Sequence, residues 1–250
     1  MCGRMTQQIP PSEVARIFDA ELRDDLPILP RFNCAPTDPL TVVLEREDGR
    51  VVERHRWGLI PPWAVDPSAG GRMINARAET VATSPAFRVA LRRRRCIVPA
   101  DGFYEWERRG RARQPWFIHR ADGQPMAMAG LWSLWRDLAV GLWISSCAVI
   151  TTAANATVAP LHDRMPVLLH ADAWDAWIDP SESSADFLRE ILVPAEAALL
   201  ARYPVSNRVN SVRNEGPDLV EPVELVPLPV PASGAPPAGA PLAQPTLFGD

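Results

Sequence analysis

The chain of 250 residues is long enough for one domain with a substantial core, and its apolar fraction of 47% is ordinary for a globular protein. No apolar run is long enough to span a bilayer and no charged-then-apolar leader precedes the body, so we expect neither membrane contact nor secretion. Four scattered cysteines and four histidines lack the spacing of metal ligands, so we expect no metal site, no cofactor and a reducing, cytoplasmic location.

The first residues, Met1-Cys2-Gly3-Arg4, contain a candidate reactive group. If Met1 is removed, Cys2 carries a free α-amine beside its thiol, and such a 1,2-aminothiol can close a five-membered thiazolidine ring on an aldehyde. An α-amine has a pKa of about 7.7–8.0, so much of it is unprotonated near neutral pH. The chain contains no lysine, so a Schiff base on a primary amine could form only at the terminus. The alternative is that this start of the chain has no chemical role.

Short helices and strands are expected to interleave along the chain. Helical patterns occur at 13–18 (capped by Pro11-Ser12), 87–95, 174–178, 185–192 and 195–202. Strand patterns occur at 41–45, 51–57, 96–100, 115–119, 126–132, 142–152, 167–169 and 203–210. Because the regular rhythm of a parallel sheet is absent, we predict an α+β fold, with one domain built on a strongly curved, barrel-like and mainly antiparallel sheet and short peripheral helices.

Turn-forming residues add four local predictions. Asp48-Gly49 and Asp122-Gly123 each predict a hairpin between the strands that flank them. Residues 31–36 are predicted to be irregular, ending where Pro36 blocks a helix. Residues 56–63 form a proline-stiffened corner that includes Trp63, on which a nucleic-acid base could stack, although a packed surface elbow would have the same pattern.

Positive charge is concentrated in the middle of the chain. The segment 72–113 holds eleven arginines and four acidic residues, although the whole chain has a net charge of −4. Such a segment could attract a phosphate backbone. The alternative for the run 92–95 is a solvated helix end.

Two further positions are candidates for proton transfer. Glu105 lies among three aromatic residues, and burial in such surroundings would raise its pKa and make it a proton donor near neutral pH; the alternative is a solvent-facing strand glutamate. His162, Asp163 and Arg164 occupy a short loop between ordered elements, a placement that suits a functional role.

After about residue 221 the composition changes to proline, alanine and glycine, which predicts a disordered tail at 221–250 behind a domain at 2–220. The tail ends with Gln244, Leu247 and Phe248 at a spacing that resembles the short motif by which bacterial repair proteins dock on the replication sliding clamp. A clamp is therefore an expected partner, because two apolar anchors on a tether would raise the local concentration of the domain on DNA.

Seven motifs, in order over about residues 2–220, resemble those of the SOS-response-associated peptidase (SRAP) family of abasic-site processing proteins. They are Met1-Cys2-Gly3-Arg4, Asn33 with Ala35-Pro36, Arg56-Trp57-Gly58-Leu59-Ile60-Pro61, Asn75-Ala76-Arg77-Ala78-Glu79-Thr80, Arg95-Cys96 through Gly102-Phe103-Tyr104-Glu105-Trp106, Ala129-Gly130-Leu131-Trp132 and His162-Asp163-Arg164-Met165-Pro166.

The resemblance implies a function and a site. It implies binding of single-stranded DNA and a thiazolidine cross-link between the terminal cysteine and the aldehyde of an abasic site, a lyase-like activity, together with peptidase removal of the protein's own Met1. The family's catalytic cysteine, asparagine, glutamate and histidine fall on Cys2, Asn75, Glu105 and His162. Arg4, Arg77 and Arg164 would hold phosphates, and Asn33 and Trp63 are further expected DNA contacts of a monomeric protein.

Two other functions fit parts of the sequence. An N-terminal-nucleophile hydrolase would use the Cys2 thiolate against an amide, with its own amine as the base. A non-catalytic single-strand binder would use tryptophan stacking and arginines, and Cys2 would be dispensable in it.

Overall fold

The structure is a computed structural model that describes residues 2–23, 29–110, 112–182 and 184–225. Its strands are β1 (Met5–Gln7), β2 (Glu21–Leu22), β3 (Arg31–Cys34), β4 (Pro39–Arg46), β5 (Gly49–Trp57), β6 (Asn75–Arg77), β7 (Arg95–Ala100), β8 (Gly102–Arg109), β9 (Ala112–Arg120), β10 (Met126–Arg136), β11 (Trp143–Ala153), β12 (Arg164–Pro166) and β13 (Leu200–Pro204). Its α-helices are α1 (Pro11–Phe18), α2 (Arg88–Arg93), α3 (Trp174–Ile178) and α4 (Ala185–Ile191), and 3₁₀ turns lie at Pro67–Arg72, Ala171–Ala173, Ala197–Leu199, Asn207–Asn210 and Pro217–Leu219.

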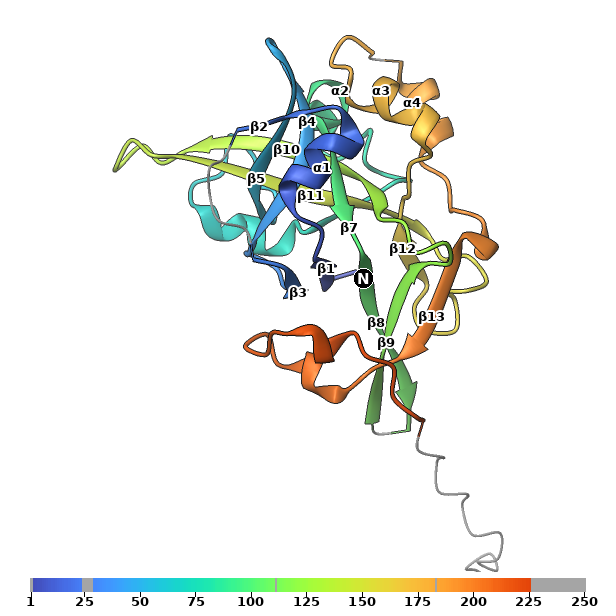
Figure 1. Cartoon of the computed structure of the whole chain (residues 1–250). Helices are drawn as coiled ribbons and strands as arrows, with labels where there is room; N and C mark the ends of the chain where they lie inside the picture. Colours follow the sequence, from blue (N-terminus) through green and yellow to red (C-terminus); the bar gives the residue numbers. More distant parts are fainter. Residues whose placement is uncertain (1, 24–28, 111, 183, 226–250) are drawn as a thin grey trace, which may run out of the picture.

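A closed ring of strands forms the centre of the fold (Figure 1). Strands β5, β4, β7, β10 and β11 pair antiparallel in that order, and β11 then pairs with β5 in parallel and completes the ring. Closure leaves no unpaired edges within the ring. The prediction of a barrel-like, mainly antiparallel α+β domain is confirmed.

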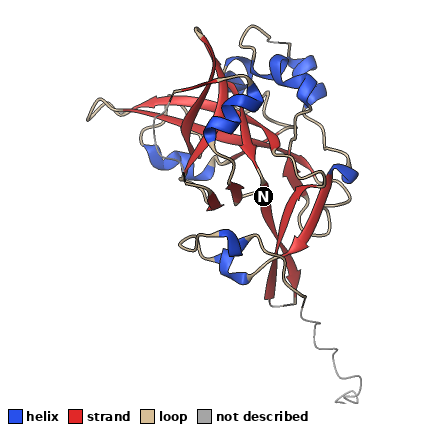
Figure 2. Cartoon of the chain, in the orientation of Figure 1, coloured by secondary structure: helices blue, strands red, loops and turns tan. Residues whose placement is uncertain are grey.

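A second sheet, in the order β13-β9-β8-β1-β3, continues from the ring at one point. Strand β7 belongs to the ring and β8 to the second sheet, and only Asp101 separates them. Gly102 begins β8, where a Cβ would lie 2.6 Å from the Ile118 carbonyl oxygen, so the close approach of β9 requires glycine there. The strand segments in red show this continuation, with β8 and β9 descending from the barrel (Figure 2).

Apolar side chains fill the ring and also cover its outside. The inner cluster includes Leu40, Val98 and Met128, and Cys2 and Met5 at the start of the chain belong to it. The outer cluster joins the ring to the helices through residues such as Val14, Leu91 and Trp177. No helix in the described ranges is long and apolar enough to cross a bilayer.

Several local predictions are confirmed and several are wrong. The hairpin at Asp48-Gly49 is present as β4–β5. The hairpin predicted at Asp122-Gly123 is wrong, because β9 pairs with β8 and β13 whereas β10 pairs with β7 and β11. The helix predicted at 195–202 is also wrong: a 3₁₀ turn at Ala197–Leu199 leads into strand β13, which pairs with β9.

Four smaller predictions also differ from the structure. Residues 31–34 are strand β3, not irregular, because they pair with β1. The strand predicted at 167–169 is wrong, because β12 ends at Pro166 and Leu168 forms an isolated β-bridge with Met128. The strand predicted at 203–210 ends at Pro204, before a 3₁₀ turn. Ser12 is not the cap of the first helix, which begins at Pro11 without a side-chain cap.

Candidate active site

Strand pairing brings the first residues of the chain beside Glu105. Met5 pairs with Phe103 in antiparallel register, and the Tyr104 N–H donates to the Arg4 carbonyl at 3.0 Å. Because the two strands are antiparallel, the residues that precede Met5 lie beside the residues that follow Phe103. Cys2 is therefore brought toward Glu105. Cys2 has no exposed surface, and burial together with the negative charge of Glu105 raises the pKa of its thiol. The Cys2 thiol is consequently protonated at neutral pH.

Asn75 holds the backbone of Cys2. It begins β6, which pairs in parallel with β11 through Val149, and its Nδ2 donates to the Cys2 carbonyl at 2.7 Å. Its Oδ1 is buried and accepts no hydrogen bond from the described residues. This oxygen is therefore available to a donor near the start of the chain.

Glu105 is a buried carboxyl group whose pKa lies near neutral pH. Its side chain is 3% exposed, and burial, assisted by the charge of Asp163, raises its pKa from 4.5 to about 7. A buried carboxyl with this pKa exchanges a proton readily at physiological pH.

His162 lies at the end of a turn that precedes β12. Its backbone N–H donates to the Val158 carbonyl at 3.1 Å, and its ring Nδ1 accepts from the backbone N–H of Arg164 at 2.9 Å. Partial burial lowers its pKa, although the neighbouring Asp163 carboxylate opposes the shift. The imidazole is therefore mostly neutral at pH 7, and its Nδ1 also lies 2.8 Å from Asp163 Oδ1.

Glu105 and His162 share a pocket of about 460 Å³ with residues that the sequence analysis did not single out. Its other lining residues are Trp106, Arg108, Arg113, Pro160 and Leu161. The sequence signal that could have indicated them is the spacing of Trp106 and Arg108, because side chains two residues apart on a strand share a face. The two proton-transfer candidates and the arginines of the β8–β9 hairpin therefore line the same pocket.

Arg4 and Asn33 form a structural pair. The Arg4 guanidinium is half-buried, donates from Nη1 to Asn33 Oδ1 at 2.6 Å and lies 5.8 Å from the Trp106 ring centre. Asn33 has no exposed surface, and its Nδ2 donates to the carbonyls of Ser211 and Asn214 at 3.0 and 2.9 Å. Asn33 therefore supports Arg4 and the C-terminal segment, and in this structure it presents no surface to DNA.

The other two predicted phosphate-binding arginines differ in their surroundings. Arg77, at the end of β6, is exposed and has no ion-pair partner in the described part of the chain. The Arg164 side chain is 14% exposed and holds both oxygens of the Glu79 carboxylate, at 2.6 and 2.8 Å. A phosphate at Arg164 would have to displace or share this carboxylate, whereas Arg77 is directly accessible.

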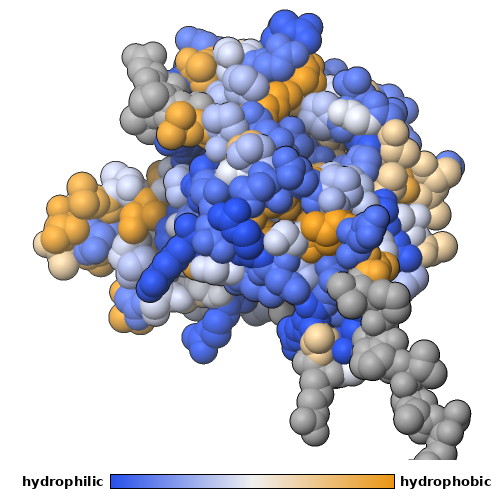
Figure 3. All heavy atoms as spheres, turned by 60° about the horizontal axis from the view of Figure 1, so that its bottom comes forward, coloured by the Kyte–Doolittle hydropathy of each residue, from blue (hydrophilic) through white to orange (hydrophobic). Residues whose placement is uncertain are grey.

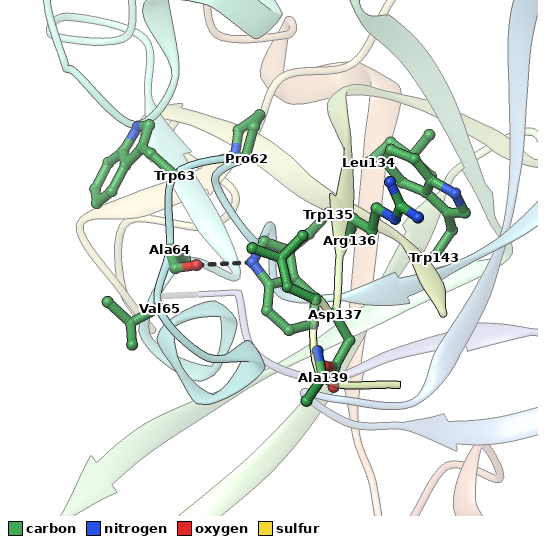
Figure 4. Close-up of a pocket in the computed structure, with 11 residues that line it drawn as sticks. Pro62, Trp63, Ala64, Val65, Leu134, Trp135, Arg136, Asp137, Ala139 and Trp143 are labelled. Atoms are coloured by element: carbon green, nitrogen blue, oxygen red, sulfur yellow. Dashed lines mark hydrogen bonds between the residues drawn. The ribbon is translucent and has the colours of Figure 1, made fainter. Parts of the chain in front are cut away.

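Trp63 lies apart from the pocket that contains Glu105 and His162. It is 65% exposed and borders a different pocket, of about 720 Å³, between residues 62–65 and the end of the β10–β11 hairpin (Figure 4). The Trp135 Nε1 donates to the Ala64 carbonyl at 2.8 Å and fixes this loop. Trp63 is thus an exposed indole on a braced loop, as stacking would require. The tail residues Gln244, Leu247 and Phe248 lie outside the described residues.

Comparisons with known proteins agree with this architecture. The SOS response associated peptidase (SRAP) family profile matches residues 1–212. The chain is 37% identical to the abasic site processing protein YoaM of Bacillus subtilis over 223 residues, covering 88% of this chain and 98% of YoaM. It is 33% identical to the abasic site processing protein YedK of Escherichia coli over 230 residues, covering 89% of this chain and 100% of YedK.

A solved structure shows the same fold. A crystal structure of a protein from Bacteroides thetaiotaomicron superposes with a TM-score of 0.80 at 24% identity and covers 89% of this chain and 100% of that one. With the family profile spanning most of the sequence and two relatives above 30% identity over nearly their whole length, the chain belongs to the SRAP family.

Proposed function

We propose that the protein processes abasic sites in single-stranded DNA by forming a covalent thiazolidine with Cys2 after Met1 is removed. The observation that carries this proposal is the enclosure of Cys2 between the Asn75 amide and a carboxyl group, Glu105, whose pKa is about 7. The names of the relatives, abasic site processing proteins, agree with the substrate.

The proposed reaction needs two bonds to the sugar aldehyde carbon and releases one water. The unprotonated Cys2 amine attacks the carbonyl carbon, and the resulting carbinolamine loses its oxygen as water to give an imine. The thiol sulfur then adds to the imine carbon, and the thiol proton is transferred to nitrogen. Because the second step is intramolecular, it benefits from an effective molarity on the order of 10⁵–10⁸ M.

Glu105 and His162 are suited to the proton transfers of this sequence. Loss of water from the carbinolamine requires an acid, and thiol addition requires a base, and a carboxyl group with a pKa of about 7 can serve as both near neutral pH. His162, mostly neutral, would assist opening of the sugar hemiacetal. Asn75 would orient the terminal residue through the Cys2 carbonyl.

The direct test is incubation of the full chain with a single-stranded oligonucleotide that carries one uracil and has been treated with uracil glycosylase. The proposal expects an adduct that survives a denaturing gel, and none with the untreated oligonucleotide. Absence of an adduct from the treated strand would refute the proposal.

Removal of Met1 by the same site is a further part of the proposal, and the family description as a peptidase supports it. A non-catalytic single-strand binder would not explain why a carboxyl group is buried beside Cys2.

Arg77→Ala is expected to weaken binding to single-stranded DNA and to flatten its salt dependence. The exposed guanidinium would release about one counterion, so the slope of log K against log salt should fall by about 0.7 in magnitude. Fluorescence anisotropy with an intact oligonucleotide between 50 and 200 mM salt measures this slope. An unaltered slope would remove Arg77 from the interface.

The tail motif makes a separate proposal, that Gln244, Leu247 and Phe248 dock on the replication sliding clamp. Deleting residues 244–250 is expected to abolish capture of the clamp in a pulldown and to leave cross-linking to free oligonucleotides unchanged. Equal capture by the full and shortened chains would end this proposal without affecting the one for Cys2.

A further inference from the structure

The β8–β9 hairpin presents two opposed arginines at the reaction pocket. Arg108 on β8 pairs directly with Arg113 on β9, both are exposed, and both line the pocket that contains Glu105 and His162. Figure 3 turns this end of the molecule forward and shows a largely hydrophilic face. Like charges at directly opposed positions of two strands repel, so this arrangement destabilises the hairpin unless an anion lies between them.

The protein supplies no such anion in its described ranges. No carboxylate there forms an ion pair with Arg108 or Arg113, whereas the intervening Arg109 lies 3.7 Å from Glu107. Strand alternation places Arg109 and Glu107 on the face opposite Arg108. The two arginines therefore form a cationic mouth to the pocket, which an anionic ligand would neutralise.

Trp106 adds a flat apolar surface next to this mouth. It lies on the same face of β8 as Arg108, two residues earlier, and lines the same pocket. Its Nε1 donates to Asn210 Oδ1 at 2.7 Å, and the Arg4 guanidinium lies over its ring, so the indole is held in one position. A fixed aromatic ring that lines the same pocket as two guanidinium groups suits a nucleotide, with its ring against the indole and its phosphate at the arginines.

We propose that Arg108 and Arg113 jointly bind one backbone phosphate of the DNA strand within three nucleotides of the lesion, with Trp106 against the nucleotide between them. This inference rests on the proposed function. Glu105 and Arg108 are three residue steps apart on the extended strand, about 10 Å, which corresponds to about three stacked nucleotide steps. Arg77 and Arg164 lie on β6 and β12, which pair with β11 of the barrel, so the hairpin provides a separate contact from the second sheet.

The test uses the full chain and a nested set of abasic oligonucleotides in which the strand is trimmed one nucleotide at a time from either side of the lesion. Cross-linking rates measured against protein concentration separate the apparent Kd from the limiting rate. The double variant R108A/R113A is compared with Arg109→Ala, which alters the opposite face of the same hairpin, and with R108K/R113K, which keeps the charge but loses the planar fork.

On the longest oligonucleotide, R108A/R113A is expected to raise the apparent Kd about tenfold with little change in the limiting rate, and to reduce the salt slope by about 0.7. The lysine pair should lie between it and the wild type, and Arg109→Ala should match the wild type. Trimming one side past the contacted phosphate should remove the difference between R108A/R113A and the wild type. This inference would be overturned if R108A/R113A raised the apparent Kd no more than Arg109→Ala does. It would also be overturned if the increase in apparent Kd persisted on every trimmed strand. Absence of an adduct with the wild type on all strands would instead refute the proposed function.

Discussion

Cys2→Ala is expected to abolish the heat-stable adduct with abasic DNA, with a loss of at least about 100-fold. The variant keeps a terminal amine once Met1 is removed, so it can still form an imine, but it has no sulfur to close the ring. The large expected effect reflects loss of the intramolecular step, whose effective molarity makes the ring far more stable than the open imine. The adduct should become visible only after borohydride reduction, and strand cleavage at the lesion should appear in its place.

A matched control is Cys147→Ala, which removes another fully buried thiol from the barrel wall. It should cross-link as the wild type does, at a temperature where both are folded. A heat-resistant adduct from Cys2→Ala without borohydride would contradict the ring mechanism.

Glu105→Gln is expected to slow cross-link formation by about 100-fold at neutral pH, because general acid–base groups contribute about 10²–10⁴-fold. The wild-type rate should change with pH around 7, the pKa to which burial raises the Glu105 carboxyl, and this dependence should be lost in the variant. Affinity for an intact oligonucleotide should stay nearly unchanged. A pH–rate profile of the variant with the same inflection near 7 would assign the proton transfer to another group.

The same substitution should stabilise the protein in alkaline solution. The folded state binds the Glu105 proton more tightly than the unfolded chain does, since the pKa rises from 4.5 to about 7. The favourable contribution of this proton to the free energy of unfolding is therefore fully present below pH 4.5 and is lost as the pH rises through 7. Glu105→Gln, which cannot ionise, should gain up to about 3 kcal/mol in free energy of unfolding at pH 8 and little at pH 4.5. Urea denaturation at the two pH values measures the difference, and an equal stability change at both would show that Glu105 is not held in its neutral form.

The sequence was informative about fold where pairing is local. Asp48-Gly49 specifies a tight turn between two alternating strands, and β4–β5 forms there. Asp122-Gly123 carries the same signal, yet its flanking strands belong to different sheets, because β9 and β10 each have better partners elsewhere. Residues 197–204 contain helix-forming alanine and leucine, but pairing with β9 makes part of this segment a strand. Such partners are distant in sequence and leave no local pattern.

The residue types of the candidate site could be predicted from the sequence, but the contacts that hold these residues in place could not. Cys2 and Glu105 could be chosen from their chemistry, and the pairing of Met5 with Phe103 brings them together. The burial of Asn33 and the engagement of Arg164 by Glu79 could not be predicted, because both depend on contacts between segments far apart in the chain. The pocket-lining positions of Arg108 and Arg113 likewise depend on the register of β8 with β9.

The central claim is that the aldehyde of an abasic site becomes part of a ring with the nitrogen and sulfur of Cys2. Intact mass spectrometry of the purified adduct, followed by peptide mapping, tests it most directly. The account predicts the mass of the chain without Met1 plus one oligonucleotide minus one water, with the DNA on the peptide that begins at Cys2. An adduct of the same stability on a chain that still carries Met1, or one mapped to another residue, would contradict it.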